Sequence, residues 1–92
     1  MTAEAHPSVR FRRAIDRQAL WAAEDAARAL PNLPLEDALK LVYLYAEKDS
    51  PKYEAAARRW LGRYLDERSP SLLDFAQMAA RLTERHPVSQ RP

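Results

Sequence analysis

Side chains that usually carry out chemistry are sparse in this chain of 92 residues. Cysteine is absent and glycine occurs once, which excludes thiolate nucleophiles, cysteine-ligated zinc and glycine-rich phosphate loops. The two histidines, His6 and His86, each precede a proline near a chain end. No histidine or carboxylate pair has metal-ligand spacing on an apolar face. The sequence therefore predicts a protein that is not an enzyme and that uses no metal or cofactor.

Trp21 has the position that packing explains least well. On a helical projection it lies about 160° from Ala19, among the polar residues Arg17, Glu24 and Arg28. Exposed tryptophan beside arginine is typical of interface hot spots. We therefore expect these four residues to bind another protein or a second copy of the chain. The alternative is that the C-terminal helix or tail covers the indole, or that Arg17 stacks on it.

Two groups of basic residues suggest a different function. They are Arg10, Arg12 and Arg13 near the N-terminus, and a stripe of Lys52, Arg59 and Arg63. Several phosphate contacts from such groups would give salt-dependent affinity for nucleic acid. However, the net charge is only +2, and the stripe offers no asparagine or glutamine that could read bases. A solvated surface explains both groups more simply, so nucleic-acid binding is the second hypothesis.

Prolines divide the chain into the helical segments that must position these residues. The composition, with 47% hydrophobic residues and seven prolines, is typical of helices separated by proline stops. Apolar residues recur at helical spacing in four segments, residues 9–30, 35–48, 51–68 and 71–85. Nine of the twelve residues at 35–46 are apolar, so we expect the second segment to be the most buried helix. In the last segment, we expect a buried stripe of Leu72, Phe75, Ala76, Ala79 and Leu82.

Serines mark three of the expected helix starts. Ser8 and Ser50 precede the first and third segments, and Ser71 with Asp74 forms a capping-box pattern. Gly62 lies on the exposed side of the third segment, where glycine costs about 1 kcal/mol relative to alanine. Either this cost is tolerated, or something approaches the backbone closely at Gly62.

These patterns predict an all-α fold, either a compact four-helix bundle or two packed helical hairpins. We expect a single domain at residues 9–86, with a mobile arm at 1–8 and a frayed tail at 87–92. No apolar run suits a signal peptide or a membrane span. Together with the absence of cysteine, this leads us to expect a cytoplasmic protein without membrane contact.

Three runs of the sequence resemble a group of small, uncharacterised all-helical proteins of GC-rich bacteria. These runs are FRRAIDRQALWAAEDAAR, LEDALKLVYLYAEKD and YEAAARRWLGRYL. The resemblance covers residues 11 to about 85 and rests on Arg12-Arg13-Ala14-Ile15, Ala46-Glu47-Lys48-Asp49 and Arg59-Trp60. None of these is a catalytic or binding motif, so the resemblance implies an all-helical fold and carries no activity.

The hypothesis that the sequence favours is a non-enzymatic, helical protein–protein interaction module. It would be a small regulatory or adaptor subunit, with self-association as one form of its binding and Trp21 as its anchor. The alternative is a small nucleic-acid-binding regulator that uses the two basic groups.

Overall fold

Five α-helices make up the computed structural model, which describes residues 6–85. They are α1 (Pro7–Asp16), α2 (Leu20–Arg28), α3 (Leu35–Glu47), α4 (Tyr53–Arg68) and α5 (Leu72–Arg85). Residues 6–85 contain no β-strand, so the predicted all-α class is confirmed. Residues 1–5 of the expected arm and the whole expected tail at 87–92 lie outside the described residues.

The expectation of one helix at residues 9–30 is wrong, because the chain turns between α1 and α2. Gln18 adopts a left-handed conformation with φ of 57°. Its N–H donates to the carbonyl of Ile15, and the N–H of Ala19 donates to the carbonyl of Ala14. These two bonds form a Schellman motif, which ends a helix and is most often built on glycine. Because glutamine occupies the left-handed position here, the sequence carried no local stop signal.

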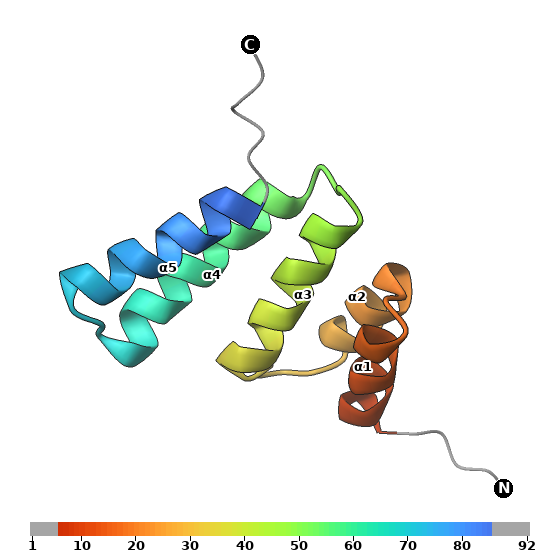
Figure 1. The fold of residues 1–92 in the computed structure, drawn as a ribbon. Helices are drawn as coiled ribbons and strands as arrows, with labels where there is room; N and C mark the ends of the chain where they lie inside the picture. Colours follow the sequence, from red (N-terminus) through yellow and green to blue (C-terminus); the bar gives the residue numbers. More distant parts are fainter. Residues whose placement is uncertain (1–5, 86–92) are drawn as a thin grey trace, which may run out of the picture.

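The helices form two pairs on either side of α3 (Figure 1). One pair is α1 and α2, whose buried residues Phe11, Ala14, Ala23 and Ala26 form a cluster with Leu44 of α3. The other pair is α4 and α5, which enclose a second cluster with α3. Its buried members are Leu35, Val42, Tyr45, Tyr53, Ala56, Ala57, Trp60 and Leu82. The molecule is therefore two helical pairs joined through α3, rather than a four-helix bundle.

The central position of α3 follows from its sequence, because a helix that is apolar on most sides must be covered on several of them. Leu44 enters the first cluster, while Leu35, Val42 and Tyr45 enter the second. Four residues are buried on α3 and four on α4. The expectation that this helix is the most buried one therefore stays a prediction, whereas its contact with both clusters is observed.

Side-chain hydrogen bonds to the backbone fix α4 against its neighbours. The indole N–H of Trp60 donates to the carbonyl of Leu35 at 2.8 Å. The hydroxyl of Tyr53 donates to the carbonyl of Leu82 at 2.6 Å. Because both donors belong to buried residues, these bonds satisfy polar groups that would otherwise destabilise the core.

The expected helix caps are partly confirmed. The Ser71 hydroxyl accepts a hydrogen bond from the N–H of Asp74 at 3.0 Å, as the capping-box pattern predicted. At α1, the cap is His6 instead of Ser8: the Nδ1 atom of His6 accepts from the N–H of Ser8, and the helix begins at Pro7. The expected helix start at Ser50-Pro51 is wrong by two residues, because α4 begins at Tyr53 with Lys52 in the cap position. Ser50 is buried, and its hydroxyl accepts from the N–H of Lys52.

Candidate interaction surfaces

The most exposed large apolar side chain among residues 6–85 is Trp21, which retains 85% of its accessible surface. It lies in the first turn of α2, whereas Ala23 and Ala26 on the opposite side of this helix have no accessible surface. No cation–π contact from Arg17 is found within the described residues. The indole therefore projects from a firmly packed helix, and α5 does not cover it.

The other three residues of the predicted partner-binding site do not all accompany Trp21. Arg17 is the C-cap that follows α1 and is exposed. Arg28 is exposed, and its guanidinium lies 3.7 Å from the carboxylate of Asp25. Glu24 instead faces the protein, with only 12% of its side chain exposed. Its carboxylate serves contacts within the chain, so we exclude it from the exposed surface around the indole.

Glu24 is the centre of a small polar network between helices. Its Oε2 atom accepts hydrogen bonds from the hydroxyl of Tyr45 at 2.6 Å and from Nζ of Lys52 at 3.0 Å. The bond from Tyr45 lowers the pKa of Glu24, burial opposes this, and Lys52 lowers the pKa further. The pKa of Tyr45 is raised mainly by burial and to a smaller extent by the bond to Glu24. At neutral pH these shifts keep Glu24 ionised and Tyr45 neutral. The network therefore connects the helices and shows no sign of a catalytic role.

The first basic group, on α1, is only partly available for phosphate. Arg10 lies 3.6 Å from the carboxylate of Asp25. Arg12 and Arg13 are exposed and form no ion pair with any residue at 6–85. Because α3 separates α1 from α4 (Figure 1), this group lies on the other side of α3 from Arg59 and Arg63 of the second group.

The second basic group is largely neutralised by carboxylates. Lys52 pairs with Glu24 at 3.0 Å, and Arg63 pairs with Glu67 at 2.8 Å. Arg63 also donates to the carbonyl of Leu33. Arg59 is the exception, since it has no ion-pair partner within the described part of the chain. The stripe therefore offers one free cation where the sequence suggested three.

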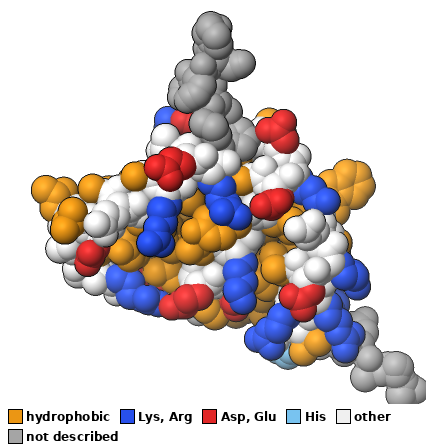
Figure 2. Space-filling model, viewed as in Figure 1, with side chains coloured by type: hydrophobic (Ala, Val, Ile, Leu, Met, Phe, Trp, Pro, Cys, Tyr) orange, Lys and Arg blue, Asp and Glu red, His pale blue; other side chains and the backbone are white. Residues whose placement is uncertain are grey.

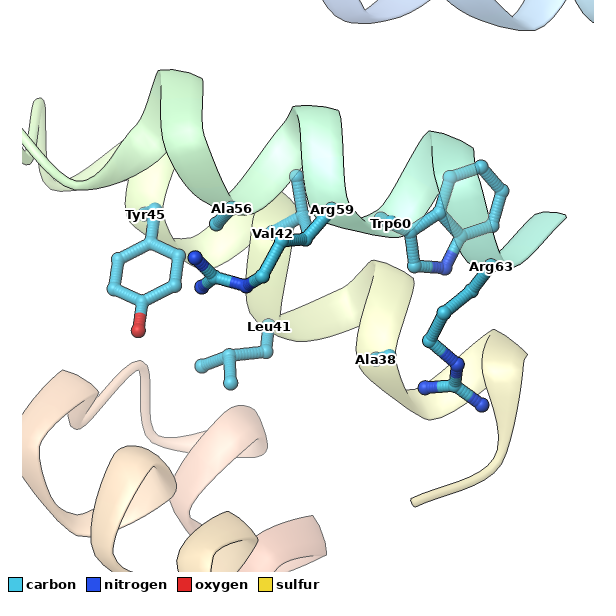
Figure 3. Close-up of a pocket in the computed structure, with 8 residues that line it drawn as sticks. All are labelled: Ala38, Leu41, Val42, Tyr45, Ala56, Arg59, Trp60 and Arg63. Carbon is cyan, nitrogen blue, oxygen red and sulfur yellow. The ribbon is translucent and has the colours of Figure 1, made fainter. Parts of the chain in front are cut away.

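A groove of about 340 Å³ lies between α3 and α4 (Figure 3). It is lined by Ala38, Leu41, Val42, Tyr45, Ala56, Arg59, Trp60 and Arg63. The two arginine side chains extend from α4 over a mostly apolar floor, and that of Arg59 points toward Tyr45. Among residues 6–85, no carboxylate or histidine lines this groove. It suits an apolar side chain next to an anionic group.

The end of the α4–α5 pair exposes three leucines, although Leu72 was expected in the buried stripe of α5. Leu65 is 49% exposed, Leu72 is 83% exposed and Leu73 is 66% exposed. Figure 2 shows hydrophobic side chains gathered at this end of the molecule. Leu72 and Leu73 are adjacent and so differ by about 100° in direction, which indicates that one buried stripe cannot contain both.

The predicted buried stripe of α5 is therefore corrected. Leu72 and Ala76 are exposed, whereas Leu82 is buried and Phe75 and Ala79 are partly buried. Met78 joins them in place of the two exposed residues. The reason is that α5 packs on one side only, where the ring of Phe75 stacks on that of Tyr64 with centroids 6.3 Å apart.

Within the described residues, no group of histidine and carboxylate side chains could hold a metal ion, and no helix is long and apolar enough to cross a membrane. Comparison with known proteins gives no match: no family model, no curated protein and no solved structure is significantly similar to the chain. The resemblance stated from the sequence therefore stays a prediction.

Proposed function

We propose that this chain is a non-enzymatic protein–protein interaction module, a small regulatory or adaptor subunit that binds its partner through Trp21. The observation that supports this proposal is the 85% exposure of an indole on a helix whose opposite side is completely buried. Because α2 is held in place by packing, a partner gains the burial of the indole without first ordering the helix. Truncation of a buried interface tryptophan typically costs about 2 kcal/mol of binding free energy or more.

The residues around Trp21 suggest the character of the partner's surface. Arg17 and Arg28 are exposed near the indole in sequence and carry positive charge. A partner would therefore present an apolar pocket with acidic residues at its edge, because interfaces place opposite charges at their rims. The apolar groove between α3 and α4 is a second place where a partner side chain fits.

Nucleic-acid binding is supported less well. Three of the six basic residues assigned to it, Arg10, Lys52 and Arg63, already contact carboxylates. The cations that form no ion pair within residues 6–85 are Arg12 and Arg13 on α1 and Arg59 on α4. Few phosphate contacts remain for one duplex, so the expected affinity is weak.

Affinity capture from the native cell lysate tests the proposal, with wild-type protein and Trp21→Ala as bait and with and without nuclease. We expect Trp21→Ala to lose a specific partner and to keep its thermal midpoint, since the indole contributes little to the core. Leu73→Ala is the matched control, because it removes an exposed apolar side chain elsewhere. If Trp21→Ala retains every partner, or if nuclease removes them all, the proposal is wrong. Sedimentation of Trp21→Ala and Leu73→Ala shows whether the partner is a second copy, because only Trp21→Ala should then lose self-association through the indole.

A further inference from the structure

Gly62 is the one glycine of the chain, and the fold of a single copy gives no reason for it. It lies in the interior of α4, where glycine is less favourable than any residue except proline. A Cβ atom added there would meet nothing within 4 Å, and the residue is exposed. Neither a turn nor a close neighbour in the same molecule therefore requires glycine at this position.

The residues around Gly62 form a regular exposed stripe along α4. Ala55, Arg59, Gly62 and Asp66 follow one another at intervals of four, three and four residues, and all four are exposed. At about 100° per residue, these intervals keep the four side chains within one narrow face of the helix. The stripe therefore has small residues, a cation and an anion on a single face.

Among residues 6–85, the two charges in this stripe are the ones on α4 that form no ion pair. The other charged residues of α4 form three ion pairs, Glu54 with Arg58, Arg63 with Glu67, and Arg68 with Glu36 of α3. Arg59 and Asp66 form none with any residue at positions 6–85. They are seven residues apart, about 10 Å along the helix, which is too far for an ion pair with each other.

We propose that α4 pairs with α4 of a second copy of this chain in antiparallel orientation, and that the two helices cross at Gly62. Arg59 and Asp66 lie equally far on either side of a point between Gly62 and Arg63. A two-fold axis through this point places Arg59 of each copy opposite Asp66 of the other. The two-fold axis thus forms two Arg59–Asp66 ion pairs, as expected for an interface built from the same patch on both copies.

The lack of a side chain at Gly62 allows the two helix axes to approach closely, since the interaxial distance depends on the side chains at the crossing point. Leu65, which is 49% exposed, lies beside the stripe and would be covered in the dimer. In the single chain, the guanidinium of Arg59 extends over the groove (Figure 3), where no carboxylate neutralises it. Because this side chain is exposed, it can turn toward the second copy.

The arrangement of charges favours a second copy over other partners. An acidic peptide would pair with Arg59 but would be repelled by Asp66, and so would nucleic acid. The surface on α4 is also separate from Trp21, because α3 lies between α2 and α4 (Figure 1). This inference therefore does not rest on the proposed function.

A charge-exchange experiment tests the dimer. Sedimentation equilibrium of the full chain at low salt, over concentrations reaching millimolar, should show a dimer that weakens as salt is added. Arg59→Asp and Asp66→Arg should each weaken dimerisation roughly 10-fold or more, because each replaces two attractive contacts with two repulsive ones. An equimolar mixture of the two variants should associate again, because the mixed dimer restores both ion pairs. Arg12→Asp and Trp21→Ala are controls that should dimerise as wild type does.

Gly62→Ala gives an independent test, because it should stabilise the monomer and weaken the dimer. The thermal midpoint of the monomer should rise, because alanine is the better helix former and its Cβ meets nothing. The dimer should weaken, because the Cβ separates the crossing helices. A wild-type chain that stays monomeric throughout would overturn the proposal. So would a mixture of the charge variants that fails to associate, or a dimer that is lost in Trp21→Ala and kept in Arg59→Asp.

Discussion

The hydroxyl of Tyr45 donates a 2.6 Å hydrogen bond to Oε2 of Glu24, and this bond connects α3 with α2. Lys52 donates to the same oxygen at 3.0 Å, so one carboxylate holds α2, α3 and the turn before α4. Because α2 carries Trp21, this network sets the orientation of the proposed partner-binding surface relative to the rest of the fold.

Replacing Glu24 with glutamine should reduce stability in a pH-dependent way. The bond from Tyr45 lowers the pKa of Glu24 in the folded state, so the carboxylate stabilises the fold above the pKa of the unfolded chain, about 4.3. This stabilisation is lost as the pH falls through the lower, folded pKa. We expect Glu24→Gln to lower the free energy of unfolding by about 1–2 kcal/mol at pH 7.

Urea unfolding at pH 7 and at pH 3 measures this effect, and the difference between wild type and Glu24→Gln should be smaller at pH 3. Glu84→Gln, which changes an exposed carboxylate on α5, is the matched control and should have little effect at either pH. An equal loss at both pH values would show that the charge on Glu24 does not contribute.

The stability lost in Tyr45→Phe should become smaller at alkaline pH, whereas the stability lost in Glu24→Gln becomes smaller at acid pH. Burial and the bond to Glu24 raise the pKa of Tyr45, so its contribution is complete below about pH 10, the usual pKa of tyrosine. Above that pH, the unfolded chain ionises first, and wild type loses stability relative to Tyr45→Phe by up to about 1.4 kcal/mol per pH unit. Guanidinium unfolding at pH 8 and pH 11 measures the change. The stability difference between wild type and Tyr53→Phe should also become smaller from pH 8 to pH 11, because burial raises the pKa of Tyr53.

The turn at Gln18 predicts that one substitution has opposite effects at two positions. A left-handed residue with a side chain costs about 1–2 kcal/mol, so Gln18→Gly should stabilise the protein. Gln77 is exposed in the interior of α5, where glycine should destabilise by roughly 0.5–1 kcal/mol. Denaturant unfolding of the two variants checks both signs. Destabilisation by glycine at both positions would instead indicate the continuous helix that the sequence suggested.

Much of the fold could be predicted from local signals. Prolines and capping serines placed the starts of α3, α4 and α5 within two residues of those observed. The turn at Gln18 could not be predicted, because neither glycine nor proline marks it. Packing determines it instead: with the turn, Ala14 and Ala23 on separate helices reach zero exposure in one cluster, and a straight helix could not bring them together.

At the candidate surfaces, too, the features set by one helix could be predicted and the contacts between helices could not. A helical projection placed Trp21 away from the alanines, and the indole is indeed exposed, even though its helix begins at Leu20. The same projection placed Glu24 beside it, which is wrong for the exposed surface. A projection of one helix cannot show that Tyr45 and Lys52, more than twenty residues away, converge on that carboxylate.

The corrected packing face of α5 predicts that Leu82 and Leu72 respond differently to truncation. Leu82 is 3% exposed and belongs to the cluster with Tyr53 and Trp60, so Leu82→Ala should cost about 2–4 kcal/mol. Leu72 is 83% exposed, so Leu72→Ala should change stability by no more than about 0.5 kcal/mol.

Equilibrium unfolding in urea gives both values, and hydrogen exchange should show that protection in α5 falls first in Leu82→Ala. Leu82 is the one buried residue that α5 contributes among the described residues, so its loss should release α5 from α4 before the rest of the protein unfolds. Equal costs at the two positions would mean that α5 packs through the stripe expected from the sequence, with both leucines in the core.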